Sequence, residues 1–134
     1  DTNVIVSGLF FSGNERRLLK KALEGKIHLI LPQDVIEETE SIIRRKFGET
    51  HDLPQAMFVF NLLKEKAEIV PRKNYKGQIN KAKSMISDPK DAPILAFLLH
   101  SKPDIFVTGD QDFKNIKLKT KTKIQSASIL VKEF

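Results

Sequence analysis

The chain has 134 residues, of which 40% are hydrophobic and 30% are charged, and its formal net charge is +6. This length suits one domain with a single core. No apolar run approaches the roughly 20 residues of a membrane-spanning helix, no secretory signal is present, and the absence of cysteine excludes disulfides, a thiol nucleophile and Cys-ligated zinc. We therefore expect a cytoplasmic protein.

Hydrophobic periodicity and turn residues predict alternating strands and helices. The predicted strands are short apolar runs at 4–6, 27–31, 67–71, 104–109 and 123–125. The predicted helices lie at 14–24, 33–47, 54–65 and 79–86, from Asp91 onward, and from Ser126 to Phe134. Such alternation indicates a parallel sheet covered by helices on both faces. We expect one domain over residues 1–134, a three-layer α/β/α fold with a mainly parallel central sheet of about four to five strands.

The first predicted strand is short on its N-terminal side. Val4, Ile5 and Val6 are β-branched, but Asp1 precedes them without an apolar lead-in. We therefore expect this strand to be truncated, and further residues to precede Asp1 in the native protein.

Acidic residues follow several of the predicted strands. Asp110 comes directly after the strand at 104–109, and Asp91 begins the helix that leads into that strand. Glu37 and Glu38 lie in the first turns of the helix that follows the strand at 27–31, and Asp1 belongs to the first strand. Since ligands of parallel sheets bind beyond the carboxyl ends of the strands, these acids are predicted to converge.

Converging carboxylates repel one another and are costly unless a cation neutralises them. Oxygen ligands without nearby histidine or cysteine favour Mg²⁺ or Mn²⁺ over zinc. Such an ion suits phosphodiester hydrolysis, because it activates water and stabilises the charge that develops on the phosphate. Taken singly, each acid is more often a helix cap or a turn residue. The hypothesis of a metal site depends on all of them meeting at one edge.

Three segments together resemble the PIN-domain family, and specifically its VapC-like, toxin-component branch. Asp1-Thr2-Asn3-Val4-Ile5-Val6-Ser7 resembles the opening motif, Asp88-Pro89-Lys90-Asp91 the third acidic motif, and Thr108-Gly109-Asp110-Gln111-Asp112-Phe113 the fourth. The resemblance covers essentially the whole chain. It implies Mg²⁺- or Mn²⁺-dependent cleavage of RNA, often as the toxin of a toxin–antitoxin pair, with an antitoxin protein as partner.

The resemblance also implies roles for individual residues. Those matching metal-binding, catalytic acids are Asp1, Asp91 and Asp110, together with Glu38, for which Glu37 is the fallback. Asp88 and Asp112 match outer ligands, while Thr2, Asn3 and Thr108 match positions that support the acids by hydrogen bonding. The alternative function is a catalytically silent PIN-like module that binds RNA or a protein.

Two further features concern partners. Residues 114–123 hold five lysines and no acid. In an extended segment Lys117, Lys119, Lys121 and Lys123 would share one face, where they either bind nucleic acid or protect a strand edge. The helix at 54–65 is apolar on more than one face, so it is either buried in its own core or shared in a homodimer.

Overall fold

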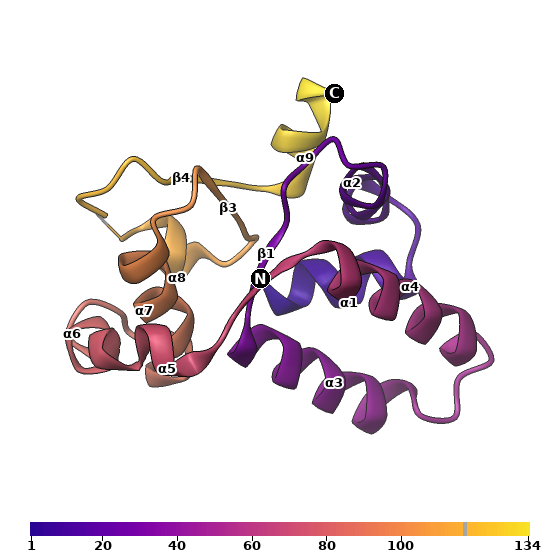
Figure 1. Ribbon diagram of the computed structural model, residues 1–134, viewed down its shortest axis with the longest axis horizontal. Coiled ribbons are helices and arrows are strands. Elements are labelled where there is room, and N and C mark those ends of the chain that lie inside the picture. The colour runs from indigo at the N-terminus through magenta and orange to yellow at the C-terminus, as the bar shows by residue number, and fades with distance from the viewer. Residues whose placement is uncertain (117) are drawn as a thin grey trace.

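Four short strands lie between two groups of helices in the computed structural model, which describes residues 1–116 and 118–134 (Figure 1). The strands are β1 (Ile30–Pro32), β2 (Glu68–Val70), β3 (Ile105–Val107) and β4 (Lys123–Gln125). The α-helices are α1 (Thr2–Phe10), α2 (Asn14–Leu23), α3 (Gln33–Phe47), α4 (Leu53–Lys66), α5 (Arg72–Tyr75), α6 (Ile79–Lys83), α7 (Ala92–Ser101), α8 (Gln111–Lys114) and α9 (Ala127–Leu130). Three short 3₁₀ helices are η1 (Lys76–Gln78), η2 (Pro89–Asp91) and η3 (Val131–Glu133).

The strands form two parallel pairs. Strand β1 pairs with β2, with Ile30 opposite Glu68, and β3 pairs with β4, with Ile105 opposite Lys123. Parallel pairing confirms the expected α/β class. Within the described residues, however, the two pairs are not hydrogen-bonded to each other, so one continuous sheet of four to five strands is not seen.

The predicted first strand at 4–6 is wrong, because these residues belong to helix α1. The Asp1 carboxylate accepts a hydrogen bond from the Val4 N–H at 3.0 Å and so caps the helix. Ile5 and Leu9, four residues apart, enter the core together. Capping and core packing thus outweigh the strand preference of three β-branched residues.

Most of the other elements agree with the sequence-based predictions. Helix α3 begins at Gln33 and ends at Phe47, as predicted, and Asp91 is the N-cap residue of α7. Short helices α5 and α8 were not predicted, because four residues are too few to show a helical period. The apolar side chains of helix α4 are only partly covered, since Phe60 is fully buried and Phe58 is 65% exposed.

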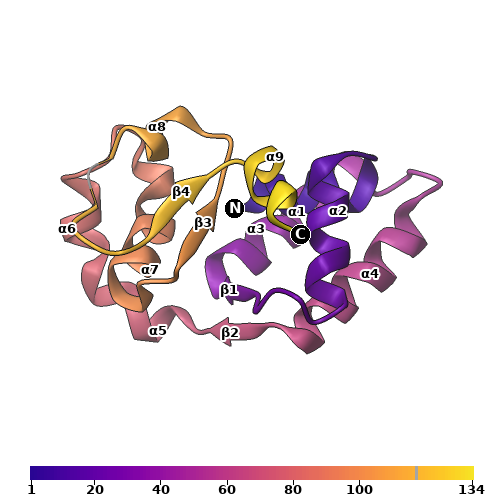
Figure 2. The ribbon, with the colours of Figure 1, turned by 90° about the horizontal axis from the view of Figure 1, so that it is seen from above.

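Strand β3 contributes to two apolar clusters on opposite faces. Phe106 belongs to the main core and packs edge-on against Phe113, with ring centroids 5.0 Å apart. Ile105 and Val107 pack against a smaller cluster that includes Leu130 of α9. Because successive side chains of a strand point to opposite faces, β3 is covered by helices on both sides (Figure 2).

Across the part of the chain that the structure describes, no helix combines the length and the apolar character needed to cross a membrane.

Candidate metal centre at the carboxyl end of β3

Thr108 and Asp110 form the base of the site, directly after β3. The Thr108 side chain is fully buried, and its hydroxyl oxygen accepts a hydrogen bond from the Asp110 N–H at 3.0 Å. The Asp110 carboxylate in turn accepts from the Asp112 N–H at 2.9 Å and caps helix α8. These bonds hold the backbone that carries both carboxylates in a defined position.

Asp91 reaches the same place from a different element. The 3₁₀ helix η2 precedes α7 and is capped by Asp88, whose carboxylate accepts from the Lys90 N–H at 3.0 Å. Asp91 is the last residue of η2 and the N-cap residue of α7, and its carboxylate makes no capping hydrogen bond. Its side chain is therefore available to a ligand.

The three carboxylates of Asp91, Asp110 and Asp112 form a compact acidic cluster. One oxygen atom from each lies within 4.8 Å of the others, and all three residues are partly buried. Burial has the largest effect on the pKa of Asp91, and together with the negative charges of neighbouring acids it raises this pKa to about 6. Those acids, in order of effect, are Asp110, Asp88, Asp112 and Glu38. A divalent cation would relieve this repulsion, and a cluster of oxygen donors alone suits Mg²⁺ or Mn²⁺.

The two adjacent glutamates of α3 differ in their surroundings. Glu37 accepts hydrogen bonds from Gln33 at 3.0 Å and from the Arg72 guanidinium. These contacts hold the pKa of Glu37 below its usual value, the Gln33 bond having the larger effect. Glu38 is exposed, and its charge reaches Asp91. Glu37 is thus engaged by a basic partner, whereas Glu38 adds to the negative charge at the acidic cluster.

Asp1 is linked to the cluster through Thr108. The Thr108 hydroxyl donates to the Asp1 carboxylate, and the main-chain nitrogen of Asp1 donates to the Val107 carbonyl at 2.7 Å. Asp1 is not among the three residues whose oxygens meet. Thr2 is buried with its hydroxyl unpartnered in the described structure, and Asn3 is exposed, so within that part neither makes the supporting bond expected of it.

Two lysines of the segment 114–123 (the lysine segment), Lys121 and Lys123, lie at the opposite end of β3 from the acidic cluster. Lys123 is opposite Ile105, at the beginning of β3, whereas Asp110 follows the end of that strand. Lys121 forms an ion pair with Asp104 at 2.9 Å, and bends at 119–121 replace the extended run that was predicted. Lys119, Lys121 and Lys123 are exposed, and Lys117 lies outside the described residues.

Sequence reasoning ranked Asp112 too low and missed a second polar cluster. Asp112 was expected only as an outer ligand, yet it belongs to the compact set. The signal was available, because a helix capped by Asp110 places Asp112 in its first turn. The second cluster joins Asp34, Arg72 and buried Tyr75: the Arg72 Nε atom donates to Asp34 at 2.9 Å, and the Tyr75 hydroxyl also donates to Asp34. This cluster joins α3 to α5, and no short sequence motif predicts it, because its residues are far apart in the chain.

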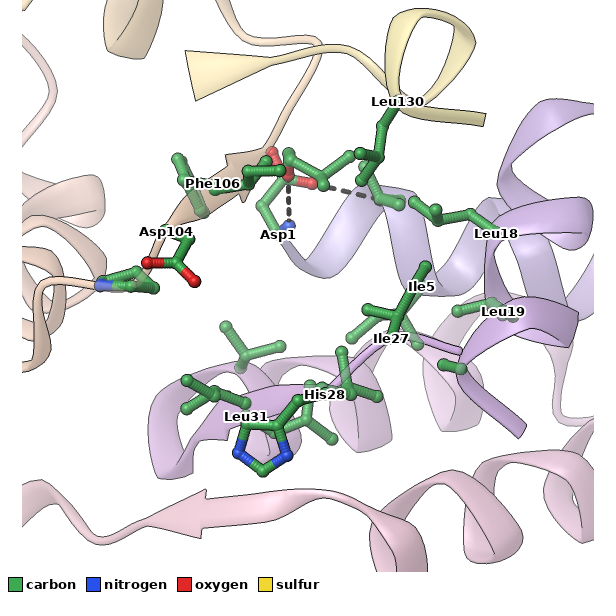
Figure 3. Close-up of a pocket in the computed structure, with 18 of the residues that line it drawn as sticks. Asp1, Ile5, Leu18, Leu19, Ile27, His28, Leu31, Asp104, Phe106 and Leu130 are labelled. Atoms are coloured by element: carbon green, nitrogen blue, oxygen red, sulfur yellow. Dashed lines mark hydrogen bonds between the residues drawn. The ribbon is translucent and has the colours of Figure 1, made fainter. Parts of the chain in front are cut away.

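An apolar cavity of about 320 Å³ separates the two strand pairs (Figure 3). Leu31 of β1 and Phe106 of β3 line it from two sides, and Ile5 of α1 lines it as well. Asp1 stands at its edge, where its nitrogen meets Val107. The cavity thus lies between the two strand edges that have no partner among the described residues.

Comparison with known families agrees with this geometry. The model of one family, described as PIN domain, matches residues 1–129. Searches among curated proteins and among solved structures gave no significant match.

Proposed function

Because the chain belongs to the PIN-domain family, whose members are generally nucleases, we propose that it is a divalent-metal-dependent endoribonuclease that hydrolyses RNA phosphodiesters. The observation that carries this proposal is the meeting of the carboxylates of Asp91, Asp110 and Asp112 beyond the end of β3. Carboxylates so close together are unfavourable on their own, and the pKa of Asp91 is raised first by burial and then by the charges of these neighbours.

The donor set fits a hard divalent cation. Asp91, Asp110 and Asp112 would hold Mg²⁺ or Mn²⁺, with Glu38 and Asp1 completing the acidic surroundings. When bound, the ion neutralises the carboxylates and supplies the Lewis acidity that activates water and stabilises charge on the phosphate.

The residues of the chain do the positioning. The Thr108 hydroxyl holds Asp1 and the Asp110 backbone together, while η2 and α7 bring Asp91 to them from a separate part of the fold. The Asp110 carboxylate, by accepting from the Asp112 N–H, fixes the first turn of α8 and with it the third acid. Such supporting hydrogen bonds orient metal ligands and raise affinity.

The decisive experiment combines cleavage and metal binding. Labelled RNA is incubated with Mg²⁺ or Mn²⁺ and either the unchanged protein or Asp110→Asn, and Mn²⁺ affinity is measured by calorimetry. We expect Asp110→Asn to lose about 100-fold or more in cleavage rate and at least about tenfold in Mn²⁺ affinity. The control is Asp52→Asn, which removes an exposed acid that makes no side-chain capping bond. Equal cleavage by the two variants would refute the proposal, and RNA binding without cleavage would favour a silent binding module.

The choice between the two glutamates is tested in the same assay. We propose Glu38 as the site glutamate because its charge reaches Asp91, while Glu37 is held by Arg72. Glu38→Gln should therefore slow cleavage, and Glu37→Gln should act mainly on stability. A larger loss of activity in Glu37→Gln would reverse the assignment.

We also propose that the two strand pairs belong to one mainly parallel sheet of about four to five strands. Strands β1 and β3 face each other across the apolar cavity, and among the described residues neither has a partner on that side. An experimental structure of the protein tests this, and two strand pairs that remain separate there would refute the idea.

Two partners are proposed with their own tests. A homodimer through α4 would cover Phe58, which is 65% exposed although Phe60 and Leu63 of the same helix are buried. Light scattering should then report a dimer that Phe58→Glu dissociates, and a monomer at micromolar concentration would exclude it.

An antitoxin protein is proposed from the family resemblance, and a neighbouring gene whose product inhibits cleavage would support it.

A further inference from the structure

A second concave surface lies between α2 and the C-terminal segment of α9 and η3. It is a hollow of about 500 Å³, and we call it the basic hollow. The cations that line it are Arg17, Lys20, Lys21 and Lys132, and among the described residues the acidic side chain that lines it is Glu24. Because α2 and α9 are distant in sequence but in contact, folding alone brings these charges together (Figure 2).

Part of this positive charge is free to meet a ligand. Lys21 lies 4.0 Å from Glu24, and the Arg17 guanidinium donates to the Asn14 side chain at 3.3 Å. Lys20 and Lys132, in contrast, have no ion-pair partner among the residues that the structure describes. Unpaired cations around a concave surface attract a polyanion.

An exposed aromatic ring completes the surface. Phe134 lines the basic hollow and remains 51% exposed. Cations combined with an exposed ring are the usual features of a surface that binds single-stranded nucleic acid, in which phosphates meet the charges and a base stacks on the ring. Charge and ring together therefore favour single-stranded nucleic acid as the ligand.

One end of the basic hollow lies on the side of β3 where the acidic cluster is found. The Gln125 carbonyl accepts from the Thr108 N–H at 3.0 Å, and α9 begins directly after Gln125. Ser128 of α9 then lines the hollow. The hollow therefore begins near the end of β3 at which Asp110 lies, whereas Lys123 lies beside the opposite end.

We propose that the basic hollow binds the phosphate backbone of single-stranded RNA and holds it next to the acidic cluster. This proposal rests on the proposed nuclease function for the identity of the ligand, but it concerns binding rather than cleavage. It assigns phosphate contacts to Lys20 and Lys132 and a base-stacking contact to Phe134.

The experiment measures RNA binding without metal, so that cleavage plays no part. Fluorescence anisotropy with a labelled 12-nucleotide RNA of unstructured sequence is recorded in EDTA at salt concentrations of about 50 to 200 mM. Each phosphate contact to a single strand contributes about 0.7 to the log–log salt slope. Lys20→Ala with Lys132→Ala should therefore flatten the slope by about 1.4, so that the unchanged protein loses about sevenfold more affinity than the variant across this range.

Two double variants serve as matched controls, since each removes the same charge. Lys46→Ala with Lys66→Ala changes exposed lysines of α3 and α4 outside the hollow, and Lys119→Ala with Lys123→Ala changes the lysine segment. We expect both to keep the slope of the unchanged protein. If the segment variant flattens the slope and the hollow variant does not, RNA follows the lysine segment and the proposal is wrong.

The remaining outcomes separate this proposal from the proposed function. Cleavage with an unaltered salt slope in the hollow variant would overturn the hollow and leave the nuclease standing. RNA binding through the hollow in a protein that never cleaves RNA would support the hollow and overturn the proposed nuclease function. Binding of an acidic polypeptide but not RNA would overturn the proposal in favour of a protein partner. Phe134→Leu adds a second readout, since it should weaken binding without changing the salt slope.

Discussion

Replacing Asp91 by asparagine should stabilise the metal-free protein, although it removes a residue of the proposed site. The pKa of Asp91 is raised from 3.8 to about 6, first by burial and then by the charge of neighbouring acids. Each unit of pKa corresponds to about 1.4 kcal/mol, so holding this carboxylate ionised at pH 8 costs at most about 3 kcal/mol. Asparagine has nearly the same shape and carries no charge, so it removes this cost.

Two effects reduce the expected gain. Asp91 is only partly buried, so solvent and salt screen part of the repulsion, which leaves about 1.5 to 2 kcal/mol. A carboxylate at the start of α7 also gains about 0.3 to 1 kcal/mol from the helix dipole, which asparagine forfeits. No capping hydrogen bond is lost, because Asp91 makes none. The net gain is about 1 kcal/mol, or a rise in melting temperature of about 4 °C for a chain of this size.

The stability difference between Asp91→Asn and the unchanged protein should depend on pH. Because the folded pKa is raised, the penalty is fully present above about pH 6 and disappears as the pH falls toward the unfolded value of 3.8. Thermal unfolding in EDTA should therefore show Asp91→Asn as the more stable protein at pH 8 and nearly equal to the unchanged protein at pH 4. Mn²⁺ at about 100 times its Kd should add about 2.7 kcal/mol to the unchanged protein only, which reverses the order.

The control is again Asp52→Asn, which alters the net charge equally at the exposed start of α4 and should lower the stability at pH 8 by about 0.3 to 1 kcal/mol, through the loss of the helix-dipole contribution alone. The reasoning is refuted if Asp91→Asn lowers the melting temperature at pH 8 in EDTA, or if its effect is the same at pH 8 and pH 4.

Three further predictions test packing and hydrogen bonds in the fold and at the site. Tyr75→Phe should cost about 1 to 3 kcal/mol in urea unfolding, because the buried hydroxyl both donates to the Asp34 carboxylate and accepts from the Asp34 N–H at 3.1 Å. Gly8→Ala should cost about 1 to 3 kcal/mol, since a Cβ there would lie 2.5 Å from Leu19 Cδ1, and an unchanged urea midpoint would show that the side chain moves aside freely. Thr108→Val should lower Mn²⁺ affinity by about tenfold in calorimetry, because it removes the hydroxyl that links two acidic residues of the site, and Thr108→Ser should restore most of that affinity.

The fold was predictable where the sequence carries a clear period or a clear stop. Helix α3 shows an apolar face over fifteen residues between Pro32 and Gly48, and its bounds were predicted exactly as found. The prediction for residues 4–6 was wrong, because the local pattern there is ambiguous. Three β-branched residues suit a strand, but the Asp1 cap and the packing of this segment in the core favour a helix. The α/β class follows from the alternation of elements, but the partition of the strands into pairs depends on long-range pairing that no local pattern encodes.

The acidic cluster could be located because its position depends on few assumptions. Asp110 follows a strand, and Asp91 stands at the start of the helix that leads into that strand. In a parallel sheet these two positions lie at the same edge, so the two acids come together. The prediction for the lysine segment depended on more assumptions, since four side chains share a face only if the whole segment is extended and in a known register. Bends at 119–121 break that condition, and the parallel register places Lys123 at the wrong end of β3. The same register brings the start of α9 toward the acids, so a search for the path of RNA on this protein should begin at the basic hollow rather than at the densest run of positive charge in the sequence.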